Sequence, residues 1–292
     1  MSNQQLGTNT FGVAKWIVSA TASDGTHTTI QAAINAASSG DTIFIRPGTY
    51  TENLTLKAGV DLTAFVCNSR AKTVSIVGKC SSNVVGTISM SGISFQTNGD
   101  YCIEVTNATL LILNNCYFFL TNANGIHQTT VSSTILIYNC QGDCGTNTYF
   151  ISTIGGIKCF FCNLGSQNTT TASTFASSDS SLEHCHFAFP ITTSGTGSIS
   201  LDFCVMLVTN TTAVTAGGSG SSIITHSRIE AGTGSAISVG AGAILPVILT
   251  NINCSNANAI TGAGTLKYAF IAFDGSSSTV NTNTVTPLAT LI

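Results

Sequence analysis

The segment Leu111-Ile112-Leu113-Asn114-Asn115-Cys116-Tyr117-Phe118 decides the fold that the sequence predicts. It places two apolar alternations on either side of an asparagine pair. Side chains alternate between the two faces of a strand, so Leu111 and Leu113 share a face, as do Cys116 and Phe118. All four face one interior only if the asparagines form a bend, and asparagine tolerates the left-handed backbone angles of a tight bend. The segment therefore predicts two short strands around a corner.

The same pattern recurs along the chain. With Cys116 as the centre, an apolar residue stands three positions before it and another two positions after it, and further windows follow this rule, except that Cys140 is followed by Gly142. Their centres are Ile93, Cys140, Cys162, Cys185, Cys204, Ser227 and Ile252. The eight centres are separated by 23, 24, 22, 23, 19, 23 and 25 residues, a period typical of solenoids.

An additional apolar strand stands upstream of most centres, so each repeat holds three short strands. These upstream positions are Ile103, Val105, Ile126, Ile151, Val214, Ile237, Val239 and Ile260. We therefore predict an all-β fold, a single-stranded right-handed parallel β-helix of about ten coils with about 23 residues in each.

The composition limits the class of protein. Only 7% of the 292 residues are charged, whereas 43% are hydrophobic, so the chain has enough apolar surface to fold. The net charge of −3 leaves no basic footprint for nucleic acid, and no apolar run approaches the length of a membrane span. We expect neither a nucleic-acid nor a membrane partner, and the first residues do not have the pattern of a signal peptide.

Five of the eleven cysteines fall in one column of the repeat, which we predict to be a buried row of reduced thiols. The row comprises Ile93, Cys116, Cys140, Cys162, Cys185, Cys204 and Ile252. Stacked neighbours would lie about 4.8 Å apart, within the range of a disulfide, so oxidation stays open. The pair Cys159-x-x-Cys162 occupies inward positions and has no second pair, which favours packing over zinc or redox chemistry. We predict no metal and no cofactor.

The ends of the chain differ from the repeat. Residues 1–16 are polar and indicate an N-terminal arm or attachment segment, residues 17–265 the β-helix with its N-terminal cap, and residues 266–292 either a C-terminal cap or an oligomerisation segment. Thr28-x-x-Gln31 has the pattern of a capping box and predicts a short helix near residues 28–38. This helix would cover the exposed apolar end of the solenoid.

Residues 30–52 read IQAAINAASSGDTIFIRPGTYTE and resemble the first coils of the pectin-lyase-like right-handed β-helix superfamily. The wider run over residues 25–65, together with residues 268–278, is closest in look to tail-fibre and tailspike-type proteins of phages. This resemblance implies a virion part that is made in the host cytoplasm without a signal peptide, and it implies homotrimers. It contains no residue whose role can be carried over.

The repeat brings together one group of charged side chains. Glu183 and Asp202 stand two positions before their centres, on the same corner of adjacent coils, so their carboxylates could approach to about 5–6 Å, as in a retaining glycosidase. The group is completed by His184 and His226, one position before their centres, and by His186 and Arg228, one position after. We expect His184 and Arg228 to be neighbours. This charged group has three interpretations: a catalytic site, a contact site for a sugar or an ion, and a solvated corner of the fold.

Three functions follow. The leading hypothesis is a non-enzymatic virion part, a rigid spike, fibre or surface-decoration subunit that forms homo-oligomers and joins other virion proteins through its N-terminal arm. The second is recognition of host surface glycans, for which the outward aromatic side chains are candidates, as they are for contacts between protomers: Tyr117, Tyr138, Phe160 and Phe161. The third is a polysaccharide lyase or glycoside hydrolase of the superfamily, with a cell-surface adhesin as a further alternative.

Overall fold

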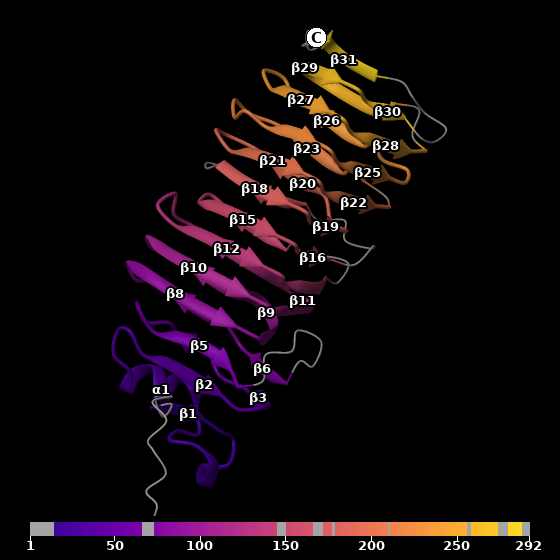
Figure 1. Ribbon diagram of the computed structural model, residues 1–292. Helices are drawn as coiled ribbons and strands as arrows, with labels where there is room; N and C mark the ends of the chain where they lie inside the picture. The colour runs from indigo at the N-terminus through magenta and orange to yellow at the C-terminus, as the bar shows by residue number, and fades with distance from the viewer. Residues whose placement is uncertain are drawn as a thin grey trace, which may run out of the picture.

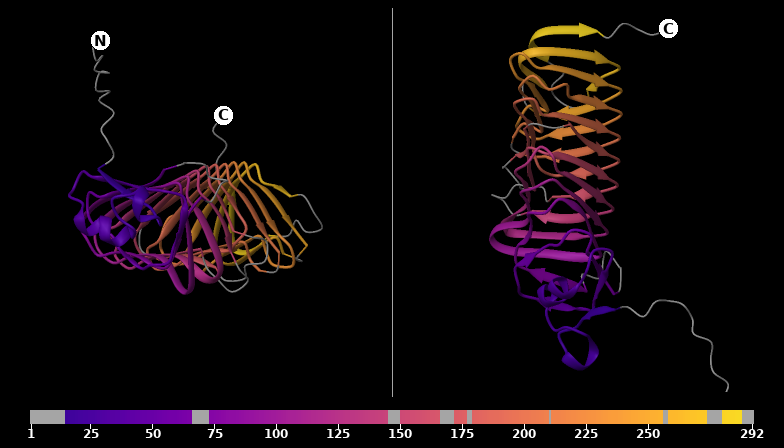
Figure 2. Two further views of the ribbon diagram at one scale, coloured as in Figure 1. Left: turned by 90° about the horizontal axis from the view of Figure 1, so that it is seen from below. Right: turned by 90° about the vertical axis from the view of Figure 1, so that its left-hand side faces the viewer.

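The protein is an elongated rod of stacked coils (Figures 1 and 2). The computed structural model describes residues 15–65, 73–144, 150–165, 172–176, 179–209, 211–255, 258–273 and 280–287. The strands form a parallel β-solenoid of about ten turns with about 23 residues in each turn, as the sequence predicts. No helix in these ranges has the length and hydropathy needed to cross a membrane.

Each coil contributes strands to three faces. The first face is built from β2 Thr42–Ile45, β5 Asp61–Ala64, β8 Gly86–Ser91, β10 Thr109–Asn114, β12 Thr134–Tyr138, β15 Gly156–Phe160, β18 Asp179–Glu183, β21 Ser198–Asp202, β24 Ile223–Thr225 and β27 Ile244–Ile248.

The second face follows the first around a corner. Its strands are β3 Gly48–Tyr50, β6 Val74–Val77, β13 Gln141–Cys144, β16 Asn163–Leu164, β19 His186–Phe187, β22 Val205–Val208, β25 Arg228–Ala231, β28 Asn251–Cys254 and β30 Ala272–Phe273.

The third face closes the coil. Its strands are β4 Leu54–Thr55, β7 Cys80–Ser82, β14 Ile151–Thr153, β17 Ser173–Phe175, β20 Ile191–Thr193, β23 Val214–Ala216 and β26 Ile237–Val239. Three long strands run through two faces: β9 Ile93–Val105 and β11 Tyr117–Gln128 join the second to the third face, and β29 Ile260–Ala269 joins the third to the first face of the next coil.

The interior is apolar because side chains alternate between inside and outside along most strands. Strand β10 buries Thr109, Leu111 and Leu113 and turns the residues between them outward. Phe118 is fully buried and contacts the rings of Phe95 and Phe150, with centroids 5.3 and 5.0 Å away. The predicted orientation of the segment around Cys116 is therefore the observed one.

One centre of the predicted repeat is misplaced. Ile252 pairs with Ile229, so it lies two residues beyond the column that holds Ser227. The residue equivalent to Ser227 is Thr250, which is buried and donates its hydroxyl proton to the carbonyl oxygen of Ile248 at 2.9 Å. The prediction was wrong because a threonine does not stand out as an inward residue in an apolar pattern.

The predicted N-terminal helix is α1 Ile30–Ala36, which buries Ile30, Ala33 and Ile34 at one end of the rod (Figure 1). Its capping differs from the predicted Thr28-x-x-Gln31 box. Thr29 is the N-cap residue, and the free amides of Ile30 and Gln31 donate to the Glu52 carboxylate at 2.8 and 2.9 Å. A carboxylate at this position also interacts favourably with the helix dipole.

The ends of the rod are continuous with the repeat. Trp16, which the sequence places at the end of the N-terminal arm, begins β1 Trp16–Val18, and this strand pairs with β2. The remainder of the arm, residues 1–14, lies outside the described residues. At the other end, the predicted boundary at residue 266 falls inside β29, on which β31 Val280–Pro287 adds one more parallel strand.

Candidate functional site

The corner between the first and second faces carries one residue per coil in a left-handed backbone conformation. Among the described residues, every non-glycine residue with positive φ lies at this corner, with φ between 46° and 55°. We call this set the corner row: Asn115, Asn139, Phe161, His184, Phe203, His226, Leu249 and Phe270. The row runs along the rod because successive coils are in register.

Four rings of the corner row stack on one another. The centroid distances are 5.1 Å from Phe161 to His184, 5.0 Å from His184 to Phe203 and 4.6 Å from Phe203 to His226. The planes tilt by 27°, 13° and 7° in the same order, so the rings face each other and present their edges to solvent. We call these four residues the ring ladder.

The corner row is the main concentration of exposed large apolar side chains in the described part of the chain. Its members expose much of their side chains: Phe161 63%, Phe203 51%, Leu249 48% and Phe270 71%. On a surface that is otherwise rich in serine, threonine and asparagine, a row in which Phe161 and Phe203 alternate with histidines and which continues into Leu249 and Phe270 indicates a contact surface.

Backbone strain supports the same interpretation. A left-handed conformation costs about 1–2 kcal/mol for a bulky L-residue and less for asparagine, whose side chain bonds locally. Asn115 and Asn139 show that the fold accepts asparagine at this corner. Stacking offsets this cost by roughly 0.5–1.5 kcal/mol per ring pair. The ring edges that face solvent make no stabilising contact within the chain. Strain that the fold does not require points to a role outside it.

Two carboxylates lie next to the ring ladder, at the ends of β18 and β21. Glu183 and Asp202 are paired in register on these strands. Their hydrogen bonds differ in direction: Glu183 accepts from Ser181 of its own strand at 2.8 Å, whereas Asp202 accepts from Thr225 at 2.7 Å and from Nδ1 of His226 at 3.0 Å, both in the next coil.

The hydrogen bonds decide the ionisation of Asp202. Partial burial raises its pKa, but the bonds from Thr225 and His226 outweigh burial, so the pKa of the carboxyl lies below its usual value. Asp202 is therefore held as an ionised acceptor. A general acid for glycoside cleavage needs the opposite, a carboxyl whose pKa is raised.

The structure does not bring the whole predicted charged group together. His184 and His226 belong to the ring ladder, where Phe203 separates them. His186 and Arg228 point from the second face, two coils apart with Val205 between them. The expectation that His184 and Arg228 are neighbours is wrong. The two residues lie two coils apart, His184 at the corner and Arg228 on the second face.

Each of these second-face side chains has its own partner. Nδ1 of His186 is 3.1 Å from Oδ1 of Asn163, in the preceding coil. Arg228 forms an ion pair with Glu230 of its own strand. Among the described residues, no group of three His, Cys, Asp or Glu side chains could hold a metal ion.

The outward aromatic residues occupy separate places. Tyr138 and Phe160 stack face to face on β12 and β15, with centroids 5.2 Å apart and planes tilted by 11°. This pair precedes the corner, and Phe161 directly follows it as the first ring of the ladder. Tyr117 lies on the second face and bonds to Asp143, and burial with this bond raises the pKa of its hydroxyl.

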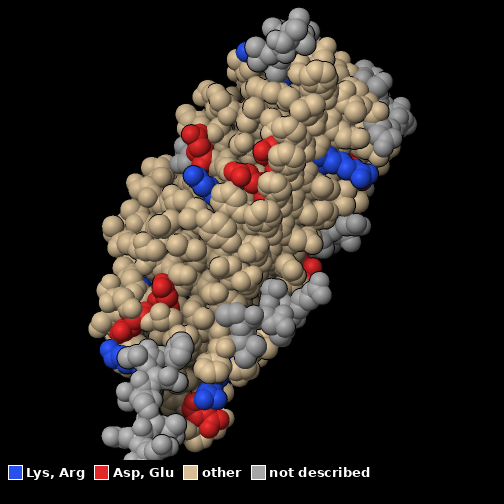
Figure 3. Space-filling model, in the orientation of Figure 1, with Lys and Arg blue, Asp and Glu red and all other residues tan. Residues whose placement is uncertain are grey.

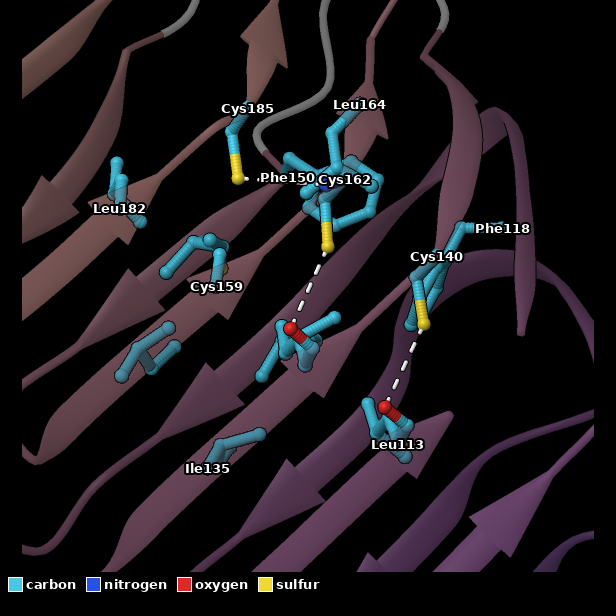
Figure 4. Packing of buried hydrophobic residues seen from close by; sticks show 14 of the residues in the cluster. Leu113, Phe118, Ile135, Cys140, Phe150, Cys159, Cys162, Leu164, Leu182 and Cys185 are labelled. Carbon is cyan, nitrogen blue, oxygen red and sulfur yellow. Dashed lines mark hydrogen bonds between the residues drawn. The ribbon is translucent and has the colours of Figure 1, made fainter. Parts of the chain in front are cut away.

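A row of buried thiols and hydroxyls supports the corner from inside. The Sγ atom of Cys162 lies within hydrogen-bond distance of the carbonyl oxygens of Phe160 at 3.3 Å and Ile137 at 3.5 Å. The Cys162 amide donates to Sγ of Cys185 at 3.4 Å, and Figure 4 shows these two thiols side by side in the core. Ser227 performs the same role, accepting from the Cys204 amide at 3.1 Å. The predicted row therefore closes the turn by hydrogen bonding as well as filling space.

Nine cysteines are buried and without disulfides: Cys80, Cys102, Cys116, Cys140, Cys159, Cys162, Cys185, Cys204 and Cys254. Hydrogen bonding to Cys162, together with burial, raises the pKa of Cys159 well above its usual value. Burial likewise raises the pKa of Cys102 to about 12. The protonated thiols of Cys159 and Cys102 are poor nucleophiles and poor metal ligands, in line with a packing role for these two residues, whereas hydrogen bonds from Cys159 and Cys185 lower the pKa of Cys162.

Two shallow hollows lie on the surface. One, of about 370 Å³, is lined mainly by the ends of β22, β25 and β28 and includes Glu230 and Asn253. The other, of about 450 Å³, lies on the first face and includes Leu110, Leu136 and Lys158. Glu183 and Asp202 line neither hollow.

The sequence interpretation missed three members of the corner row: Phe203, Leu249 and Phe270. Their signal was present, because all three occupy the position that directly precedes a centre or its equivalent. Comparing that position across every coil would have shown a change from asparagine to bulky side chains.

No protein-family model matches the chain, and no curated protein sequence matches it. Solved structures do. A pectin methylesterase from carrot is 12% identical, with 96% of this chain and 89% of that chain covered and a TM-score of 0.50. A mannuronan C-5 epimerase A-module from Azotobacter vinelandii is 12% identical, with 88% and 89% covered and a TM-score of 0.48. The catalytic domain of a GH87 α-1,3-glucanase is 13% identical, with 98% and 67% covered and a TM-score of 0.47.

At these sequence identities the similarity concerns the fold alone, and it rests on the comparison with the carrot enzyme. The carrot enzyme is not named as a phage protein, so the phage-type resemblance stays a prediction from sequence, as does the resemblance to the pectin-lyase-like superfamily. The chain has a parallel β-helix fold that is similar to the fold of the carrot pectin methylesterase.

Proposed function

We propose that the protein is a rigid, non-catalytic structural rod that contacts a partner along its corner row. The observation that carries this proposal is the set of bulky, exposed side chains held in left-handed backbone conformations at one corner. A contact surface explains why these residues replace asparagine, since the partner would cover the ring edges that solvent now reaches.

The remaining properties of the rod are those of a structural protein. Its core is continuous and its parallel strands pair from β1 to β31, which makes the rod stiff along its length. Charged residues are few, so neither strong repulsion nor a large desolvation cost opposes lateral packing. The sequence resemblance to tail-fibre and tailspike proteins supplies the setting that we propose: a spike, fibre or decoration subunit of a virion, present as a homo-oligomer of three chains.

Oxidative footprinting of the corner row tests this function. The native assembly is compared with the purified chain diluted until light scattering shows a monomer, and the expected result is protection of Phe161, Phe203 and Phe270 in the assembly. Phe65 and Phe119 are exposed outside the corner row and serve as internal references. Equal oxidation of the corner rings in both samples would overturn the proposal.

A second candidate is a protein that acts on or binds a polysaccharide. It is favoured by the carboxylate pair Glu183 and Asp202 at the edge of the first face, near the stacked rings of Tyr138 and Phe160. The lowered pKa of Asp202 speaks against a general acid there. Neutral sugar binding needs no such acid, because hydroxyl groups can donate to the two carboxylates.

Two assays separate the candidates. Release of reducing ends or of methanol from pectin, alginate and α-1,3-glucan is measured for the unchanged protein and for the double variant Glu183→Gln, Asp202→Asn. If the unchanged protein shows turnover and the double variant does not, the protein is an enzyme and the structural proposal is overturned. A glycan array, read with the Phe160→Ser variant as control, detects binding without turnover.

A further inference from the structure

A single line of sulfur atoms runs beneath the corner between the first and second faces. Five successive coils each contribute one buried cysteine, and we call these residues the thiol file: Cys116, Cys140, Cys162, Cys185 and Cys204. The backbone keeps them in register, because the amide after each cysteine bonds to the carbonyl oxygen of the cysteine one coil earlier, as from Asn163 to Cys140 at 2.9 Å. Figure 4 shows the sulfur atoms of Cys140, Cys162 and Cys185 aligned.

Neighbouring thiols of the file contact each other. Hydrogen bonds join Cys116 to Cys140, Cys162 to Cys185, and Cys185 to Cys204. The backbones that carry these side chains repeat at the separation of hydrogen-bonded strands, about 4.8 Å. Rotation of the side chains brings two sulfurs into contact or returns them to this spacing. The five sulfurs thus border four gaps of nearly equal length.

Backbone amides of the corner point at the file. The amide of Cys116 donates to Sγ of Cys140 at 3.3 Å, and the amide of Cys162 donates to Sγ of Cys185 at 3.4 Å. The amide of Cys185 bonds in the same way to Cys204. Hydrogen bonds of this kind favour the thiolate, which is the form of cysteine that binds metals. The corner therefore supports the form of these side chains that a metal ion needs.

The spacing of the file fits a metal ion that has two ligands in line. A bond between a thiolate and a metal is about 2.3 Å long, so two such bonds in line span about 4.6 Å, close to the strand separation. Cu(I) and Ag(I), monovalent ions with a filled d shell, prefer soft thiolate ligands and accept two of them in line. Zn(II) needs four ligands in a tetrahedron. The described residues offer no group of even three metal-binding side chains.

The charge balance allows such ions in a dry core. Each monovalent ion that enters a gap replaces one thiol proton, so an S–H bond is broken, a sulfur–metal bond is formed and the proton leaves to solvent. Neither sulfur nor metal changes its oxidation state. The net charge of the core stays at zero, which avoids the high cost of an unpaired buried charge. Four gaps therefore accept four ions and release four protons.

We infer that the thiol file is a binding site for soft monovalent metal ions, Cu(I) or Ag(I), held in line between the sulfurs of successive coils. The inference is independent of the proposed partner contact, because the file lies inside the corner and the corner row lies outside it. Bound ions join neighbouring coils and stabilise the middle of the rod.

Silver titration of the reduced, full-length chain tests the site. Native mass spectrometry in chloride-free buffer counts bound Ag(I), and each variant is compared with the unchanged chain. Cys162→Ser interrupts two gaps and should lose two ions, whereas Cys204→Ser removes the last gap and should lose one. Both should fold, because serine already stands in this column at Ser227 and makes equivalent bonds. Cys159 contacts Cys162 from outside the file and stays unchanged in all variants.

Cys254→Ser is the matched control. Cys254 is as buried as Cys162, each with 3% exposure, but its neighbour in the preceding coil is Ala231 and not a cysteine. This variant should bind as many ions as the unchanged chain. If all three variants lose one ion each, the thiols bind silver independently of one another and the inference is overturned.

Stability and selectivity give a second test. Ag(I), and Cu(I) supplied under argon with a competing chelator, should raise the thermal midpoint of the unchanged chain, and binding should weaken as pH falls because protons compete for the thiolates. Zn(II) should have no such effect, since charged side chains are few and scattered on the surface seen in Figure 3. A midpoint that silver leaves unchanged or lowers, or that Zn(II) raises equally, would overturn the inference.

Discussion

The amide of Cys116 donates a hydrogen bond to Sγ of Cys140, 3.3 Å away in the next coil. The same sulfur donates to the carbonyl oxygen of Tyr138 at 3.3 Å. One buried thiol thus provides the acceptor for the Cys116 amide and a second donor for the Tyr138 carbonyl, which also accepts from the Asn115 amide at 3.0 Å. Serine and threonine occupy the equivalent positions 227 and 250 and make similar bonds.

The Cys140→Ala variant should therefore lose more stability than its small change in volume suggests. We expect a decrease of about 1–3 kcal/mol in the free energy of unfolding, since a buried amide loses its acceptor. The Cys140→Ser variant keeps both bonds and should lose less. Urea unfolding measures the two values, and a serine variant less stable than the alanine variant would contradict the hydrogen-bonding role.

Phe118 and Tyr117 test the inward and outward assignment. Phe118→Ala removes a fully buried ring that contacts Phe95 and Phe150, and should cost about 3–5 kcal/mol. Tyr117→Phe removes only the hydroxyl bonded to Asp143, on the outer face, and should cost about 1 kcal/mol or less. Chemical denaturation of both variants measures the difference, and similar losses would show that the strand is assigned to the wrong face.

Asn139 tests the backbone strain at the corner. Its φ of 51° is accessible to asparagine but unfavourable for a β-branched residue. We expect Asn139→Val to cost about 1–2 kcal/mol, while Asn139→Gly, which relieves the restriction, stays near the unchanged protein. Thermal unfolding of the pair gives the comparison. A valine variant as stable as the glycine variant would argue against strain at this position.

Asp41 makes the N-terminal end of the rod sensitive to acid. Its carboxylate accepts hydrogen bonds from the amide of Ser38 at 2.7 Å and from Nε1 of Trp16 at 2.8 Å, and these bonds lower its pKa. A folded pKa below the unfolded value means that the stabilisation is complete above the unfolded pKa of 3.8 and is lost as pH falls through the folded pKa.

The Asp41→Asn variant should therefore differ most from the unchanged protein near neutral pH and converge with it once the pH has fallen below the folded pKa of Asp41. Tryptophan fluorescence reports this directly, because Trp16 is the single tryptophan of the chain. A stability difference that stays constant from pH 7 to strongly acidic solution would contradict the assignment.

Glu52 caps helix α1 from a neighbouring coil. The Glu52→Ala variant leaves the amides of Ile30 and Gln31 without their acceptor and should cost about 1–2 kcal/mol. The control is Thr28→Ala, which removes the hydroxyl that the local sequence pattern suggests as a cap and should be nearly neutral. Thermal unfolding of both variants tests this, and the reverse order of effects would restore the local capping box.

Much of the fold is readable from local pattern. The alternation of Leu111 and Leu113 identifies a face of a strand, and its repetition near Cys140, Cys162 and Cys185 identifies coils, because both depend only on neighbouring residues. The local pattern did not predict the buried position of Thr250, because this residue is buried through a hydrogen bond and not through hydrophobicity. It did not predict the cap from Glu52, because Glu52 lies 21 and 22 residues from the amides that it accepts from.

The candidate site was readable only in part. Glu183 and Asp202 were expected side by side, and the strands pair them in register. The stacking of Phe161, His184, Phe203 and His226 depends on the register in which the coils stack, which no single segment encodes. The same register places Arg228 two coils away from His184.

By itself, the sequence determined a solenoid with a dry interior and a nearly uncharged surface, since period and composition are properties of the chain alone. Only the tertiary structure decided which exposed side chains meet. Residues about 23 positions apart become neighbours when coils stack, and the left-handed corner then aligns their rings and separates the charges on its two sides.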